Sequence, residues 1–196
     1  MHPTLRTIES EHRSISAVLA GLMHFVQQGM NNRPMPEARV FRAMLQYLDL
    51  FGERLHHPKE DKEIFARVRQ RSRDADAILD RLQGDHFEGA EAIRALEQSF
   101  LRYEEGGVPF FDAFARQVEG YVAFYRGHMR TEEERIFPIA EAVLTEDDWR
   151  SIDAAFASHH DPLASAQEEQ DLKRLFTHIV TIAPAPIGVG PELARS

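Results

Sequence analysis

The stretch HMRTEEERIF at residues 128–137 has a counterpart, HHPKEDKEIF, at residues 56–65. Aligned at an offset of 72 residues, the two stretches share a histidine, a glutamate four residues later, and a closing Ile-Phe; the polar pairs are His56 with Glu60 and His128 with Glu132. Residues four apart lie on one face of an α-helix, one turn apart. The repeat therefore predicts two matched helices, each presenting an imidazole beside a carboxylate.

Each of these pairs has a histidine upstream on a preceding helical segment. His12 lies 44 residues before His56, and His86 lies 42 residues before His128. Both upstream histidines take core-facing positions in stripes of apolar residues with helical spacing. Each half of the chain thus reads His … His-x-x-x-Glu, with one histidine on its first helix and a pair on its second.

Apolar residues recur with the helical period in four long segments, which run over about residues 4–28, 36–71, 72–106 and from 109 to about 142. Ser72 is a suitable N-cap, and Pro109 suits a first helical turn. Pro58 removes one backbone N–H and is expected to kink the second segment. No stretch shows strand alternation. We therefore predict an all-α protein, an antiparallel up-down four-helix bundle with a short C-terminal helix and an extended tail.

Three regions are expected along the chain. Residues 1–142 would form the bundle that carries the histidine and glutamate repeat, and residues 143–170 a short helical extension capped by Thr145. Residues 171–196 would form a C-terminal segment, whose apolar residues 175–180 can pack on the bundle or on a partner protein, and a tail rich in Pro and Gly. His159 and His160, at the end of the short helix, are expected to be an exposed loop pair.

Composition excludes several classes of protein. The chain has 196 residues with ten histidines and no cysteine, which excludes disulfide scaffolds, zinc fingers and thiol catalysis. The net charge of −9 argues against a nucleic-acid or anionic-membrane partner. No run approaches the ~18 apolar residues of a membrane span. The first residues have no apolar signal-peptide core, so we expect a cytoplasmic protein.

Histidine and glutamate on facing helices of a bundle are typical of a buried metal site. Imidazole suits iron, zinc and copper, and a carboxylate can bridge two ions. Four imidazoles and two bridging carboxylates leave positions open on two octahedral metals, even beside one oxo or hydroxo bridge. A small diatomic molecule or peroxide could bind there.

This pattern resembles the hemerythrin-like, or HHE cation-binding, family over about residues 5 to 142. The residues that carry the resemblance are His12, His56, Glu60, His86, His128 and Glu132. Their order looks most like the repair-of-iron-centres branch, although that branch also has a cysteine-bearing N-terminal region that this chain lacks. The resemblance implies a non-haem centre of two irons per chain, with zinc or manganese as substitutes, in which the two glutamates bridge the metals.

Several alternatives stay open at the level of sequence. His57 could take the place of His56 if Pro58 rotates the helix. Tyr121 and Tyr125 fit core packing or the wall of a small-molecule pocket. Glu133, Glu134, Asp61, Glu63 and Glu53 are acids that would be solvated or would hydrogen-bond a ligating imidazole.

Three classes of function fit the pattern. The first is a di-iron protein that binds or senses O2, NO or peroxide, as a sensor, a scavenger or an iron-handling protein. The second is a weak oxidase, peroxidase or NO-processing enzyme. The third is a regulatory interaction module with a structural metal, whose partner would bind the C-terminal segment.

Overall fold

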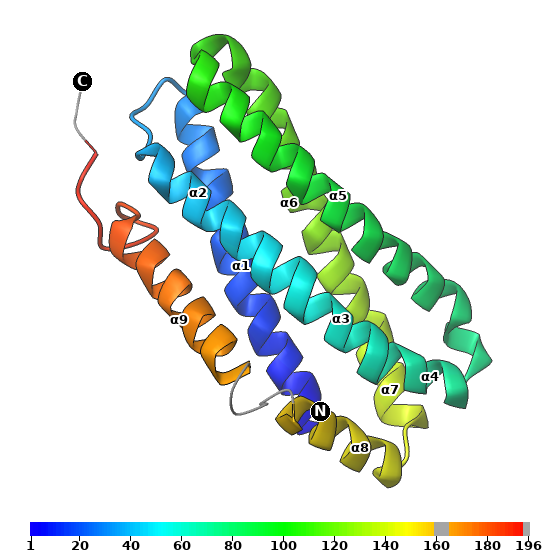
Figure 1. Cartoon of the computed structure of the whole chain (residues 1–196). Helices are drawn as coiled ribbons and strands as arrows, with labels where there is room; N and C mark the ends of the chain where they lie inside the picture. Colours follow the sequence, from blue (N-terminus) through cyan, green and yellow to red (C-terminus); the bar gives the residue numbers. More distant parts are fainter. Residues whose placement is uncertain (159–164, 194–196) are drawn as a thin grey trace.

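The computed structural model describes residues 1–158 and 165–193, and within these residues the chain is helical with no strand (Figure 1). This confirms the all-α prediction. His159 and His160 lie outside the described residues. No described helix is both long and apolar enough to cross a membrane.

Four long helical rods form the bundle (Figure 1). The first is α1 (Pro3–Met30), and the third is α5 (Asp76–Gly106), entered through a 3-10 turn (Arg73–Ala75). The second rod is composite and consists of α2 (Ala38–Tyr47), η1 (Leu48–His56), α3 (His57–Lys59), η2 (Glu60–Phe65) and α4 (Ala66–Arg71). The fourth comprises η4 (Val108–Phe110), α6 (Phe111–Thr131), η5 (Glu132–Ile136) and α7 (Phe137–Val143). The segments η1, η2 and η5 are π-helical.

Two of the π-helical segments lie just before a proline. η1 ends two residues before Pro58, and η5 ends two residues before Pro138. A proline in a helix lacks the N–H that would bond four residues back, and its ring clashes with that carbonyl. A wider i→i+5 turn relieves the clash, and such turns often occur at functional sites. The second rod therefore stays helical through Pro58, and the local change is a widened turn.

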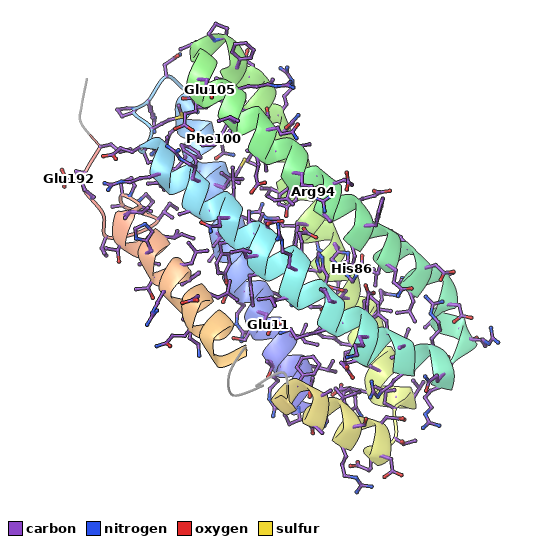
Figure 2. The ribbon with its side chains drawn as sticks, viewed as in Figure 1. Glu11, His86, Arg94, Phe100, Glu105 and Glu192 are labelled. Atoms are coloured by element: carbon purple, nitrogen blue, oxygen red, sulfur yellow. The ribbon has the colours of Figure 1, made fainter. Side chains whose placement is uncertain are left out.

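The apolar core is divided into two clusters along the bundle. One cluster, which includes Leu22, Phe41 and Phe114, fills the half towards the loop between α5 and α6. The other, which includes Leu82 and Ile136, fills the half nearer the N-terminus of α1. The polar residues of the sequence motif lie between the clusters. In Figure 2, His86 and Glu11 mark the level of the motif, and Phe100 lies nearer the loop between α5 and α6.

A short helix, α8 (Glu146–Ser158), follows the bundle as the sequence predicts. Its N-terminus is closed reciprocally, because the Asp148 amide donates to Thr145 Oγ1 (3.2 Å) and the Thr145 amide donates to Asp148 Oδ2 (2.9 Å). The helix crosses the end of the bundle near the N-terminus, where the Trp149 ring stacks on His2.

A further helix, α9 (Ser165–Ile182), packs against α2 and was not predicted (Figure 1). Ile179 is buried in this contact, which covers one side of the bundle. The tail expected to be extended instead turns back, because the Val189 amide donates to Val180 O and the Gly190 amide donates to Ala183 O.

Candidate metal centre

The structure brings together all six side chains of the sequence motif, one or two from each rod of the bundle. They are His12 on α1, His56 on η1, Glu60 on η2, His86 on α5, His128 on α6 and Glu132 on η5. Each is at most 7% exposed. Both glutamates are the first residue of a π-helical segment, so the matched stretches of sequence also share this local conformation.

The Glu60 carboxylate divides its two oxygens between the halves of the motif. Oε1 lies 3.5 Å from His12 Nε2 and 3.4 Å from His56 Nε2. Oε2 faces the other way and lies 3.8 Å from His86 Nε2. This is the arrangement required of a carboxylate that bridges two ions.

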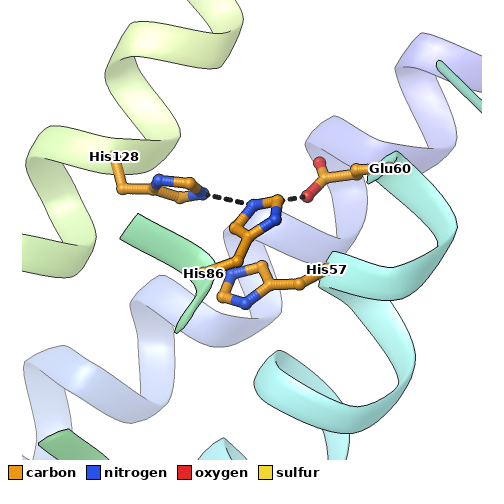
Figure 3. Close-up of side chains that lie close together, drawn as sticks. All are labelled: His57, Glu60, His86 and His128. Atoms are coloured by element: carbon orange, nitrogen blue, oxygen red, sulfur yellow. Dashed lines mark hydrogen bonds and ion pairs between the residues drawn. The ribbon is translucent and has the colours of Figure 1, made fainter. Parts of the chain in front are cut away.

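Glu132 divides its oxygens in the same manner. Its Oε2 lies 3.3 Å from His12 Nε2, and its Oε1 lies 3.3 Å from His128 Nε2 and 3.7 Å from His86 Nε2. The two inner nitrogens of His86 and His128 are 3.0 Å apart (Figure 3). Two donors that each bind one ion at about 2.0–2.2 Å lie about 3–4 Å apart when they are neighbours around it. The observed separations fit such a shell.

The outer nitrogen of every histidine in the cluster faces a carboxylate. The pairs are His12 Nδ1 with Glu133 (2.7 Å), His56 Nδ1 with Glu11 (2.7 Å), His86 Nδ1 with Asp61 (3.0 Å) and His128 Nδ1 with Asp85 (3.4 Å). A carboxylate only accepts hydrogen bonds, so Nδ1 carries the proton and donates the hydrogen bond. The Nε2 lone pair is then directed at the centre of the cluster, as in metal sites where a carboxylate orients the ligating imidazole.

Sequence reasoning anticipated part of this outer ring. Glu133 and Asp61 were considered as partners of a ligating histidine, whereas Glu11 and Asp85 were missed. The available signal was an acid directly before each upstream histidine, as Glu11-His12 and Asp85-His86. The other acids considered, Glu63 and Glu53, bond Arg67 and His57 respectively.

The inner atoms of the cluster are buried without hydrogen-bond partners. They comprise Nε2 of His12 and His56 and both carboxylate oxygens of Glu60 and Glu132. Burying one polar group unpaired costs roughly 1–3 kcal/mol, and more when it is charged. A set of such atoms at one point, flanked by apolar clusters, is explained by a cation that accepts all of their lone pairs.

Comparison with known proteins agrees with this geometry. The sequence matches the hemerythrin HHE cation-binding domain over residues 3–140, which spans the four rods and all six clustered residues. The chain belongs to this family. No curated protein and no solved structure gave a match. The hemerythrin HHE domain here has a buried His/Glu cluster suited to metal binding.

In the absence of metal, the protonation states of the clustered histidines and glutamates in this HHE domain depend on one another. Burial alone would lower the pKa of His12, but the carboxylates around both of its nitrogens, Glu132 first among them, raise it well above its usual value. Burial would likewise raise the pKa of Glu132, and the neighbouring imidazoles hold it well below its usual range. The pKa of His86 rises to about 10, against the effect of burial, because Asp61 accepts from its Nδ1 and the Glu132 carboxylate lies near its Nε2. Metal binding would therefore displace protons from the inner nitrogens.

A fifth buried histidine, His57, lies beside the cluster of this HHE domain (Figure 3). It comes within ligand range of Glu60, His86 and His128. Its two nitrogens, however, are both bonded, Nδ1 to Glu53 Oε2 (3.0 Å) and Nε2 to the Tyr125 hydroxyl (3.0 Å). This favours His56, whose inner nitrogen has no partner. Adjacent histidines can both face inward because the helix is π-helical up to His56 and again from Glu60.

The two tyrosines considered in the sequence are buried and hydrogen-bonded. Tyr121 is 3% exposed and donates to Glu53 Oε1 (3.0 Å), and Tyr125 is fully buried. Gly52 makes room for the second phenol, since a Cβ at that position would collide with the Tyr125 hydroxyl. Burial raises the pKa of both tyrosines well above the usual value.

Proposed function

We propose that the chain is a non-haem di-iron protein that binds or senses O2, NO or peroxide. His12 and His56 would hold one iron, His86 and His128 the other, and Glu60 and Glu132 would bridge them. The observation that supports this assignment is the division of both carboxylates, whose oxygens face different histidines and have no other partners.

Iron is the metal we propose because its chemistry fits this donor set. Imidazole nitrogens suit iron, zinc and copper, whereas bridging carboxylates suit harder ions, and iron accepts both. Zinc and manganese would fit as substitutes. Bound iron supplies the capacity to take up and reduce a small oxidant at positions that the six side chains leave open. The closest likeness we propose within the family is to the repair-of-iron-centres branch, on the ligand set of four histidines and two glutamates.

The protein itself would orient and insulate the centre. The outer carboxylates fix the four imidazole rings, so the ligands are held in position before any metal arrives. The two apolar clusters on either side keep bulk water away from the ions. A buried site of this kind suits a sensor or scavenger of small molecules, because larger substrates cannot reach it.

Metal analysis under anaerobic conditions tests the proposal. We expect two irons per chain and an optical band of an oxo-bridged pair that changes when air or NO is admitted. Glu132→Gln should lower the iron content and abolish this band. Glu134→Gln, which removes an exposed carboxylate two residues away, is the matched control and should leave both unchanged. Two irons retained in a chain with both Glu60→Ala and Glu132→Ala would overturn the assignment.

A further inference from the structure

Four buried side chains beside the cluster form one continuous hydrogen-bonded chain that the proposed metal ligation does not use. The chain runs from Tyr125 to His57, from His57 to Glu53, and from Glu53 to Tyr121, with each link 3.0 Å long. None of the four is more than 9% exposed. Buried polar groups linked in this manner are costly to assemble unless every member is satisfied, and here every member has a partner.

The direction of each hydrogen bond follows from the chemistry of Glu53. When ionised, its carboxylate only accepts hydrogen bonds, so it accepts one from the Tyr121 hydroxyl and another from His57 Nδ1. His57 Nε2 then has no proton and accepts from the Tyr125 hydroxyl. The Tyr125 phenol is therefore held against a base, at a point where no water is needed to take its proton.

The same chain lies in contact with the candidate metal centre. The His57 ring stacks on His86, with centroids 4.1 Å apart and planes at 13°. The Tyr125 ring centroid lies 6.3 Å from that of His128. The Tyr125 ring therefore lies beside one proposed ligand, His128, and is separated from another, His86, by the ring of His57.

We propose that Tyr125 is a redox-active tyrosine that supplies one electron when hydrogen peroxide is reduced at the metal centre. This inference rests on the proposed di-iron function. Loss of an electron makes a phenol a strong acid, and the O–H bond of Tyr125 would break as its proton passes to His57 Nε2. The proton on His57 Nδ1 would move to Glu53 Oε2 at the same time, so the imidazole passes a proton on without a change of charge.

The electrons and atoms of this step balance. The O–O bond of hydrogen peroxide breaks, and its two oxygens leave as two waters after taking up two electrons and two protons from solvent. When one iron of the pair is ferrous and the other ferric, one electron would come from the ferrous ion, which would become ferric, and the other from Tyr125, which would become a neutral radical. The phenolic proton ends on His57 Nε2, and the proton that His57 Nδ1 gives up ends on Glu53. By supplying the second electron, Tyr125 would protect the surrounding imidazoles from oxidation.

Electron paramagnetic resonance of the full chain tests this inference. The iron-loaded protein, reduced to one ferrous and one ferric ion per chain, is mixed with hydrogen peroxide, frozen, and examined for a tyrosyl signal. We expect the signal in the wild-type chain, and growth with ring-deuterated tyrosine should collapse its proton splittings. Tyr125→Phe should abolish it. Tyr103→Phe, which alters a tyrosine of α5 outside this hydrogen-bonded chain, is the matched control and should retain it.

Further variants keep the test decisive. His57→Met removes the proton acceptor and should abolish the signal as Tyr125→Phe does. If Tyr125→Phe fails to fold, a chain with Phe at positions 47, 103 and 121 keeps Tyr125 as its only tyrosine and should still give the signal. A signal that survives Tyr125→Phe, or has full yield in His57→Met, would overturn the inference. Iron content measured on the same samples separates the two proposals: an iron-loaded chain without a tyrosyl signal refutes only this inference, and a chain that takes up no iron refutes the proposed function.

Discussion

Glu53→Gln should stabilise the metal-free protein by an amount that grows with pH. Burial raises the pKa of Glu53 from its ordinary value of 4.5 to about 7. In the folded chain the carboxyl therefore keeps its proton over a range where the unfolded chain has already lost it. Below about pH 4.5 both states are protonated and Glu53 has no effect on stability. As pH rises from there to about 7, folding requires the uptake of a proton, and the free energy of unfolding of the wild-type chain falls.

The magnitude follows from the size of the shift. Each unit of pKa difference corresponds to about 1.4 kcal/mol, so a rise from 4.5 to about 7 costs the wild-type chain on the order of 3 kcal/mol above pH 7. Glutamine reproduces the neutral carboxyl, because its carbonyl accepts from Tyr121 and its amide group donates to His57. It does not titrate. The stability difference between the two chains should therefore be small at acid pH and reach this value near neutrality.

Urea unfolding followed by circular dichroism measures the effect, with chelator-treated protein at a series of pH values. Other groups also bind or release protons on unfolding, so the informative quantity is the difference between the two chains at each pH. Glu88→Gln, an exposed carboxylate on α5, is the control for the loss of a negative charge. A difference between wild type and Glu53→Gln that is the same at all pH values, or that shrinks as pH rises, would refute the reasoning.

Three further outcomes are expected. Thr145→Ala removes the hydroxyl that caps α8 and should cost about 1 kcal/mol in the free energy of unfolding; no loss in urea unfolding would show that the cap is replaceable. Leu82→Ala should cost about 2–5 kcal/mol by the same assay, because the side chain is fully buried in the apolar cluster below the metal site; a cost under half a kcal/mol would mean that this cluster collapses freely. Glu133→Gln weakens the orientation of His12 and should lower metal affinity about 10–100-fold in a chelator competition, whereas Glu134→Gln should not; equal affinities in the two variants would contradict a role for the outer carboxylate.

Sequence reasoning recovered the fold and the inner cluster because both depend on helical periodicity. The step of four between His56 and Glu60, and again between His128 and Glu132, fixes which side chains share a face. The 72-residue repeat then matches the two faces. Once the helices are known to pack antiparallel, these positions can only meet in the interior.

What sequence reasoning missed depends on tertiary contacts. Glu11 bonds His56 on another rod, and Asp85 bonds His128 on another rod, so no local spacing reveals either pair. A disturbance was expected at Pro58 and none at Pro138, and the effect of the widened turn before Pro58, which turns two adjacent histidines inward, is set by packing. Helix α9 was missed although Leu172, Phe176 and Ile179 have helical spacing and Ser165 stands three residues before Glu168, the spacing of a capping box.

The repeat also shows where the two halves of the centre must differ. At an offset of 72 residues, His57 matches Met129, and Glu53 matches Tyr125. The inner ligands are the same in both halves, and so is the pattern of outer acids, since Glu11 and Asp85 each bond the second histidine of their own half.

The hydrogen-bonded chain is built from positions at which the repeat is broken. Glu53 and His57 come from the second rod, and Tyr125 comes from the fourth, at the position equivalent to Glu53. If both halves carried the residues of the first, two carboxylates would face each other and neither would have a phenol beside it. If both halves carried the residues of the second half, each tyrosine would lack a histidine to accept its proton. A single chain on the side of His86 requires this asymmetry, so the two metals would have alike ligands but different neighbours, and the hydrogen-bonded pair of Tyr125 and His57 would lie on the side of His86.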